Sequence, residues 1–237
     1  MAFDGITMAA LADELNQKIM GGRISKISQP EKEEIILTIK NEGNQYRLFL
    51  SASPSLPLIY LTDANKQSPM TAPNFCMVLR KHLQGAKILS VATRGLERVI
   101  SLSMEHLDEM GDLCVRTLNF ELMGKYSNLI LCDSDATIID SLKHVSASMS
   151  SVREVLPGRA YFVPAQENKK DILTATREEF LQLFEEAAVP AYKVIYTSYV
   201  GISPFVAKEL CNETDTSERI LAKDLSQESK EDLWKAC

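Results

Sequence analysis

The sequence has few cysteines, and their arrangement excludes a disulfide framework. The five cysteines are an odd number, lie far apart in the chain and form no CxxC pair. This usage is typical of reduced thiols in a cytosolic protein. The chain also lacks an N-terminal secretory signal and an apolar run long enough to span a membrane. We therefore expect a cytoplasmic protein that does not insert into membranes.

The sequence is equally poor in the motifs of catalytic and metal-binding proteins. His82, His106 and His144 are its histidines, and none has a second ligand at a recognised metal spacing. A nucleophile elbow, a Walker motif and a dinucleotide fingerprint are all missing. We therefore expect no enzyme activity, no metal and no cofactor.

A basic excess is missing as well. Residues 1–170 contain 19 lysines and arginines and 19 acidic residues, whereas residues 171–237 contain 7 and 13, which accounts for the whole net charge of −6. Domains that bind nucleic acid usually carry a basic patch or stripe. Any contact of this chain with nucleic acid must therefore use a local patch.

The patterns that are present predict an α+β fold. With 237 residues, 45% of them hydrophobic, the chain is large enough for one large or two modest domains. Helical spacing predicts helices at 7–20 and 75–84, and Asn41-Glu42-Gly43-Asn44 predicts a hairpin turn. Alternating patterns predict strands at 23–29, 34–40, 45–51, 58–62, 86–93, 97–104, 113–122, 127–132 and 137–142. Such an antiparallel series with two helices indicates a sandwich-like sheet.

The periodicity changes from 2 to 3.6 near Lys169. Helices are predicted at 177–187, 191–199 and 203–211, with one or two more within 217–236. We place a domain boundary at about 168–172, which gives an α+β domain at 1–170 and an all-α domain at 171–237.

One charged pair stands out in the predicted strand at 97–104. Because side chains in a strand repeat every second residue, Arg98 shares a face with the apolar Leu96 and Ile100. An unpaired guanidinium there would cost several kcal/mol, roughly. Its partner is Glu97 bending back at a bulge, a buried carboxylate, or an anionic ligand in a cleft; alternatively, the strand frays and the arginine reaches water. Arg116 is a parallel case, on one face with Leu118.

The predicted helix at 75–84 carries a second polar group. Arg80 and Lys81 lie away from its apolar face, with His82 nearby. Cations grouped in this way suit contacts with phosphate. The alternative is an ordinary solvated helix face.

A third polar group interrupts two apolar strands around Gly124, where a glycine permits a bulge or a close backbone approach. Lys125, Ser127 and Asn128 supply the hydrogen-bond donors that bind phosphate and ribose oxygens. The alternative is a turn whose polar residues satisfy only one another.

Seven segments in order resemble the NFACT-N family, the amino-terminal family of fibronectin-binding protein A and of ribosome quality control factors of the RqcH and NEMF type. The matching segments are Phe3-Asp4-Gly5, 20–30, the 75–82 helix, 95–99, 121–131, 139–144 with 156–158, and Gly201-Ile202-Ser203-Pro204. The resemblance implies a fold similar to the amino-terminal domain of formamidopyrimidine-DNA glycosylase. It also implies that a helix-hairpin-helix domain follows.

The resemblance also implies a function. Members of the family bind obstructed large ribosomal subunits that carry stalled peptidyl-tRNA, recruit tRNA, and support carboxy-terminal tailing of the stalled chain. In bacteria the tail is alanine, so the implied tRNA is alanine-accepting. The coiled coil and the NFACT-R domain of the family do not appear in these 237 residues. We therefore expect the chain to be a fragment of a longer protein.

The resemblance implies particular tRNA-binding residues. The family has Asp-Arg where this chain has Glu97-Arg98, and that pair is tied to tRNA engagement. Asp4 matches a second acidic position with the same role. The glutamate keeps the charge but moves the carboxylate outward by one methylene.

Two other functions compete with this one. The older family name implies an adhesin that binds fibronectin, and the missing export signal argues against it. The glycosylase-like fold suggests a DNA glycosylase, but Met1-Ala2-Phe3-Asp4 supplies neither the amino-terminal proline nor the adjacent glutamate of those enzymes.

Overall fold

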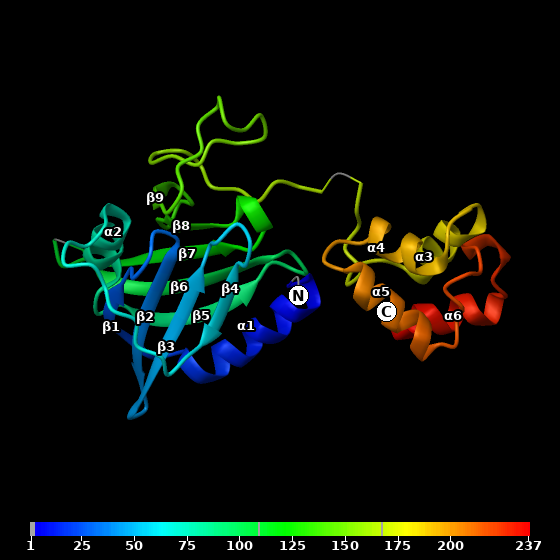
Figure 1. Ribbon diagram of the computed structural model, residues 1–237, viewed down its shortest axis with the longest axis horizontal. Helices are drawn as coiled ribbons and strands as arrows, with labels where there is room; N and C mark the ends of the chain where they lie inside the picture. The colour runs from blue at the N-terminus through cyan, green and yellow to red at the C-terminus, as the bar shows by residue number, and fades with distance from the viewer. Residues whose placement is uncertain (1–2, 109, 167) are drawn as a thin grey trace. The chain divides into compact units, whose positions relative to one another are not determined.

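A computed structural model describes residues 3–108, 110–166 and 168–237. Strands dominate up to Ser141 and helices follow from Arg177 onward (Figure 1). The strands are β1 (Arg23–Ser28), β2 (Glu34–Asn41), β3 (Asn44–Ser51), β4 (Leu58–Leu61), β5 (Lys87–Thr93), β6 (Val99–Leu107), β7 (Leu113–Glu121), β8 (Asn128–Cys132) and β9 (Ile138–Ser141). The helices are α1 (Gly5–Ile19), α2 (Asn74–Leu83), α3 (Arg177–Glu185), α4 (Ala191–Ser198), α5 (Pro204–Glu213) and α6 (Gln227–Ala236), with short 3-10 turns η1 (Gly124–Tyr126) and η2 (Ala222–Asp224).

All named strands belong to one antiparallel ladder in the order β4-β3-β2-β1-β5-β6-β7-β8-β9. The pair of Arg23 with Lys87 joins β1 to β5 and so links the two halves. Backbone hydrogen bonds flank it, from the Ile24 amide to the Ala86 carbonyl at 2.9 Å and from the Ile88 amide to the Gly22 carbonyl at 2.8 Å. The predicted turn between β2 and β3 is confirmed, since Glu42 and Gly43 both have positive φ, as a type I′ hairpin requires. The α+β class is likewise confirmed by this large antiparallel sheet and its helices.

The ladder folds back on itself. β2 and β9 are six strand steps apart, which would be about 29 Å in a flat sheet. Yet Lys143, just after β9, has its Nζ 2.9 Å from Oε1 of Glu33, just before β2, and donates to the Ala52 carbonyl after β3 at 2.6 Å. A lysine side chain makes these contacts only when the two halves face each other, which is a two-layered arrangement.

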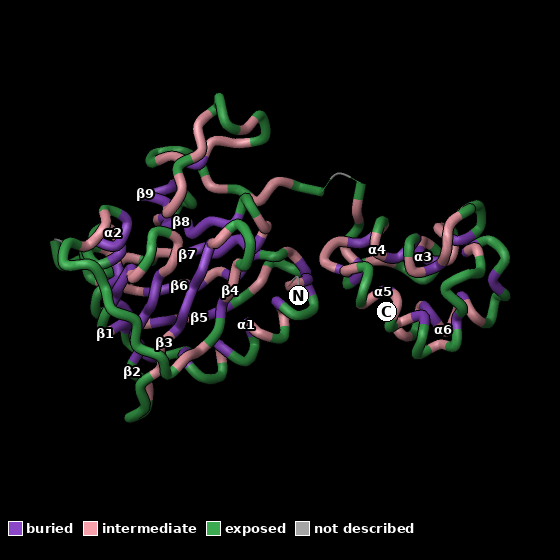
Figure 2. The backbone as a smooth tube through the Cα atoms, in the orientation of Figure 1, coloured by how far each residue is buried: buried purple, intermediate pink, exposed green. Residues whose placement is uncertain are grey.

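The predicted inward face of the first half is buried. Ile35, Leu37 and Ile39 of β2 are fully buried, and Leu50 and Leu48 of β3 pair with the first two of them. Figure 2 shows the buried segments running along the strands while the turns between them are exposed. Burial of such side chains contributes about 1.5–3 kcal/mol each, which makes this strand pair a main source of stability.

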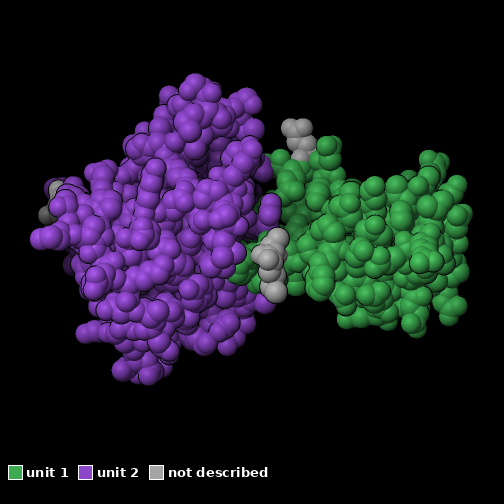
Figure 3. Space-filling model, in the orientation of Figure 1, with its two compact units in different colours: residues 1–9, 95–97, 165–237 green, residues 10–94, 98–164 purple. Residues whose placement is uncertain are grey.

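Two compact units divide the residues, and neither is a continuous stretch (Figure 3). One comprises 10–94 and 98–164, and the other comprises 1–9, 95–97 and 165–237. In the second unit, α3 to α6 surround an aromatic core in which the Phe180 ring lies 5.0 Å from Phe184 and 5.3 Å from Trp234. The segment predicted as helical at 217–236 contains η2 and α6.

None of the helices in the described part of the chain combines the length and the apolar character that crossing a membrane requires.

Candidate nucleic-acid interface

Arg98 lies on the surface immediately before β6. The strand begins at Val99, and a bend at Arg98 breaks the alternation, so that Val99 and Ile100 are both buried while Arg98 is exposed. The expectation that Arg98 shares the apolar face is therefore wrong, and the alternative in which the arginine reaches water holds. Its carbonyl accepts a hydrogen bond from the Leu122 amide at 2.9 Å, which fixes the backbone of this exposed cation beside the end of β7.

The 3-10 turn η1 starts two residues after Leu122 and presents a cation and an aromatic ring. Lys125 and Tyr126 are both exposed, Tyr126 by 69%, and the lysine Nζ lies 4.9 Å from the centre of the tyrosine ring. Gly124 has φ +58°, the left-handed region that glycine adopts without strain. An exposed ring next to a positive charge is the combination that binds unpaired nucleotides by stacking and charge. Tyr126 is not among the residues that the sequence predicts to bind RNA.

Ser127 and Asn128 hold this turn in place. The Ser127 hydroxyl accepts a hydrogen bond from the Met123 amide at 2.9 Å. The Asn128 side chain donates to the Lys143 carbonyl at 2.8 Å and accepts from the Lys143 amide at 2.9 Å. Both residues are buried, so the turn exposes Lys125 and Tyr126 while these two residues fix its backbone.

A buried charged cluster supports the same end of β7. Glu121 is 1% exposed, lies 2.5 Å from Arg153 Nη2, and accepts a hydrogen bond from the Tyr161 hydroxyl at 3.0 Å. Burial, together with the Glu121 charge, raises the pKa of Tyr161 well above its ordinary value. Sequence patterns do not point to Arg153 and Tyr161 as partners of Glu121, because they lie 32 and 40 residues from it in an irregular segment.

Asp4 is buried, and both of its carboxylate oxygens accept hydrogen bonds. Oδ1 accepts from the Thr7 amide at 2.9 Å and caps the start of α1, while Oδ2 accepts from the Ser203 hydroxyl at 2.7 Å. Ser203 in turn caps α5 by accepting from the Val206 amide at 3.2 Å. Asp4 therefore joins the starts of two helices within its unit.

Two glycines allow three segments to meet beside Glu97. The Gly5 amide donates to the Gly201 carbonyl at 2.7 Å. A Cβ atom would lie 2.0 Å from the Leu96 carbonyl oxygen if built on Gly5, and 2.1 Å from it if built on Gly201. Two motifs that lie almost 200 residues apart in the sequence thus pack against Leu96, the residue before Glu97. They are Phe3-Asp4-Gly5 and Gly201-Ile202-Ser203-Pro204. The Glu97 carboxylate accepts from the Gln166 side chain at 3.3 Å.

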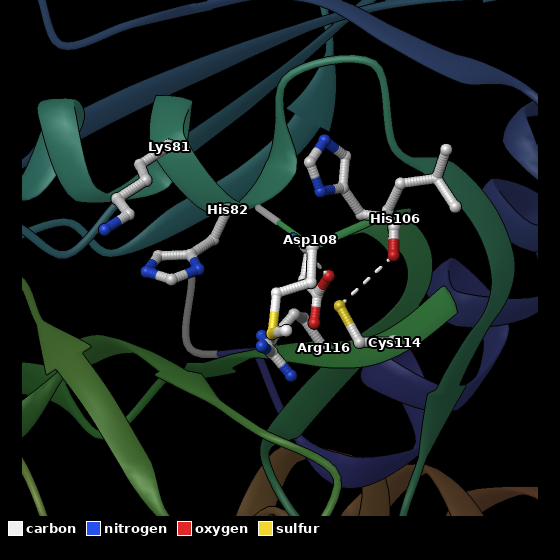
Figure 4. A pocket seen from close by; sticks show the side chains of 8 residues that line it. Lys81, His82, His106, Asp108, Cys114 and Arg116 are labelled. Atoms are coloured by element: carbon white, nitrogen blue, oxygen red, sulfur yellow. Dashed lines mark hydrogen bonds between the residues drawn. The ribbon is translucent and has the colours of Figure 1, made fainter. Parts of the chain in front are cut away.

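Arg80 and Lys81 lie in the last turn of α2. Arg80 Nε donates to the Ile27 carbonyl at 3.0 Å, and basic residues in a last helical turn are favoured by the helix dipole. Lys81 and His82 line a cavity with His106, near the far end of β6 (Figure 4). Since His106 is eight residues from Arg98, about 26 Å along a strand, the predicted cations form two separate groups.

Arg98 and Arg116 are not neighbours. Arg116 pairs with Met104 across β6 and β7, whereas Arg98 precedes the other end of β6. A shared network of the two arginines is therefore excluded. Among the described residues, no three histidine, cysteine or acidic side chains come together in a way that would hold a metal ion.

Comparison with known families gives a match over almost the whole chain. The sequence model of the NFACT N-terminal and middle domains matches residues 4–237. The Rqc2 homolog RqcH of Bacillus subtilis (strain 168) is 40% identical over 223 residues, which are 93% of this chain and 39% of that protein. The chain thus spans about two fifths of the length of this curated relative.

Solved structures agree with this match. The N-terminal domain of the fibronectin-binding protein PavA from Streptococcus pneumoniae superposes with a TM-score of 0.83 at 33% identity, covering 91% of this chain and 80% of that one. The N-terminal part of the fibronectin/fibrinogen-binding protein from Streptococcus suis gives a TM-score of 0.84 at 31% identity, covering 99% of this chain and 85% of that one.

Proposed function

The chain belongs to the family of NFACT N-terminal and middle domains, and we propose that it is the part of a ribosome quality control factor that engages tRNA on the large ribosomal subunit. Such a factor would recognise large subunits with stalled peptidyl-tRNA and support carboxy-terminal tailing of the nascent chain. In a bacterium the tail would be alanine and the recruited tRNA alanine-accepting.

The observation that carries this proposal is the exposed cation group at one end of the β6–β7 pair. Arg98 is exposed there, and Lys125 is exposed beside the Tyr126 ring in the turn that follows β7. The hydrogen bond from the Leu122 amide to the Arg98 carbonyl joins the two segments. Arginine and lysine bind phosphate oxygens, and RNA loops offer unstacked bases to aromatic rings. The chain as a whole is acidic, so a local patch of this kind is where RNA would bind.

Other residues have supporting roles in this proposal. Ser127 and Asn128 would fix the backbone of this surface through their hydrogen bonds to Met123 and Lys143. Glu97 and Asp4 belong to the other unit and form hydrogen bonds within it. Arg80 and Lys81 would add charge for more distant phosphates of the ribosome or tRNA. The protein would position its RNA partners and perform no covalent step, because peptide-bond formation belongs to the ribosome.

The test is the binding of purified tRNA to the wild-type chain and to Arg98→Ala, measured at stepped salt concentrations. We expect a loss of at least tenfold in affinity with an unchanged melting temperature, because Arg98 is exposed. Arg219→Ala removes another exposed arginine, in the segment between α5 and η2 of the other unit, and should bind as the wild type does. Wild-type affinity in Arg98→Ala would refute the assignment of this residue.

A second candidate is fibronectin binding, which the names of the two solved relatives favour. Immobilised fibronectin should retain the purified chain if this function is present, and excess tRNA should compete only if both ligands use the Arg98 group. Absence of retention at micromolar protein would remove this candidate.

A further inference from the structure

A cavity of about 410 Å³ lies between the last turn of α2 and the tip of the β6–β7 hairpin, at the opposite end of these strands from Arg98. Six polar or charged side chains line it: Lys81, His82, His106, Asp108, Cys114 and Arg116 (Figure 4). Small-molecule sites in proteins are typically concave and of roughly 300–1,000 Å³. The cavity is therefore of the size that holds a small ligand and not only water.

Arg116 supplies the chemistry of the cavity. It stands on β7 opposite the fully buried Met104, and its Nη1 donates to the Val115 carbonyl at 3.2 Å. Its Nε is buried and has no hydrogen-bond partner among the described residues. A buried donor without an acceptor is unfavourable, and the planar guanidinium fork suits the paired oxygens of a phosphate or carboxylate.

The remaining charges favour an anion. Asp108 brings a negative charge, but its Oδ1 accepts hydrogen bonds from the Met110 and Asp112 amides, both at 2.9 Å, and so shapes the hairpin turn. Among the described residues that line the cavity, the Lys81 and Arg116 cations and two imidazoles accompany the Asp108 carboxylate. Lys81 and His82 also interact with other parts of the chain.

The rim of the cavity is apolar. Leu107 and Met110 line it and are 56% and 88% exposed, so their side chains offer a hydrophobic surface next to the charged floor. A ligand with a flat or apolar body would cover part of that surface, and burying it would add to affinity.

We propose that this cavity binds a small phosphate ester, with the phosphate against Arg116 and Lys81 and an apolar or aromatic body against Leu107 and Met110. A nucleoside monophosphate has both parts. The site is separate from the Arg98 group, since about 26 Å of strand separates His106 from Arg98. It shares only Lys81 with the residues proposed above to contact more distant phosphates.

Titration calorimetry of the 237-residue chain with adenosine monophosphate, inorganic phosphate and adenosine tests the proposal. We expect adenosine monophosphate to bind, inorganic phosphate to bind at least tenfold more weakly because it lacks the apolar body, and adenosine to bind at least tenfold more weakly because it lacks the charge. No detectable binding of adenosine monophosphate at millimolar concentration, or equal binding of adenosine, would overturn it.

Variants locate the site. Arg116→Gln should weaken the binding of adenosine monophosphate at least tenfold, and Lys81→Gln, an exposed change that leaves packing intact, at least threefold. Arg98→Ala should leave the affinity for adenosine monophosphate unchanged. A failure of the tRNA proposal and a failure of the cavity proposal therefore give different results. Wild-type affinity in Lys81→Gln would overturn the placement even if Arg116→Gln did not fold.

Discussion

The two ends of the β6–β7 pair carry arginines in opposite environments. At one end Arg98 is exposed, stands before the strand begins, and has Lys125 and Tyr126 in the neighbouring turn. At the other end Arg116 is partly buried within the strand and lines a cavity. An exposed cation exchanges partners easily and suits a long charged polymer, whereas a buried one is costly without an anion and suits a small ligand that fits around it.

The support beneath these two ends also differs. A buried ion pair and a tyrosine hydroxyl satisfy Glu121 next to the Arg98 end. At the other end the Arg116 Nε is unsatisfied within the described residues. We infer that the first end is built as a rigid platform and that the second is completed by its ligand.

The largest effect is expected from breaking the platform. Glu121→Gln leaves the Arg153 guanidinium, which is 11% exposed, without its counter-charge, and should lower the free energy of unfolding by about 3–5 kcal/mol. Urea unfolding monitored by circular dichroism measures the change. The exposed pair of Arg159 with Glu154 is the control, since Arg159→Gln should cost less than about 1 kcal/mol. Equal losses in the two variants would contradict the platform.

A smaller loss is expected from Tyr161→Phe. This change removes one hydrogen bond to the Glu121 carboxylate, and such bonds to charged groups contribute about 1.5–3 kcal/mol. The pH dependence gives a second readout. Because the folded-state pKa of Tyr161 is raised, the unfolded tyrosine ionises first, and stability falls as the pH rises above about 10. Tyr161→Phe should make that fall shallower, and an unchanged alkaline profile would argue against the buried hydroxyl.

The most direct test of the comparison between the two ends measures the affinity of each arginine variant for both ligands. Arg98→Ala should lose at least tenfold in tRNA affinity, about 1.4 kcal/mol, while it keeps its affinity for adenosine monophosphate. Arg116→Gln should show the reverse. If one variant loses both ligands with an unchanged melting temperature, the two ends do not function separately.

The smallest effect concerns salt. Lys125→Gln should reduce the slope of log affinity for tRNA against log salt by about 0.7–1, because one phosphate contact fewer releases one counterion fewer. Lys40→Gln removes an exposed lysine on β2 and should leave the slope unchanged. A common slope for Lys125→Gln and the wild type would remove Lys125 from the tRNA surface.

Local patterns predicted most of the secondary structure. Alternation identified strands with one buried face, such as β6, where Ile100, Leu102 and Met104 are buried and the serines between them only partly so. The Asn41-Glu42-Gly43-Asn44 turn followed from glycine's freedom at positive φ. The same rule failed at Arg98, because a bend at this residue interrupts the extended backbone just before β6 and leaves its side chain exposed. Periodicity holds only while the backbone stays extended.

The candidate site was only partly readable from the sequence. Lys125 could be identified because a glycine turn between apolar strands exposes its neighbours. From their residue types, Ser127 and Asn128 could equally be exposed hydrogen-bond donors. Their partners in the structure, the Met123 amide and the Lys143 backbone, show that they stabilise the turn instead. Tyr126 looks like any aromatic residue in the sequence, and its exposure depends on what packs nearby.

The sequence by itself determined the α+β class, the family, and the local charges of this protein, since these depend on residue type and on spacing within a few positions. Tertiary structure alone decided which distant residues meet, as Asp4 does with Ser203 and Glu121 with Arg153. It also decided that Arg116 and the end of α2 line one cavity. Contacts between residues far apart in the chain depend on how the ladder folds back, and hydrogen-bonding capacity does not reveal which partner is within reach.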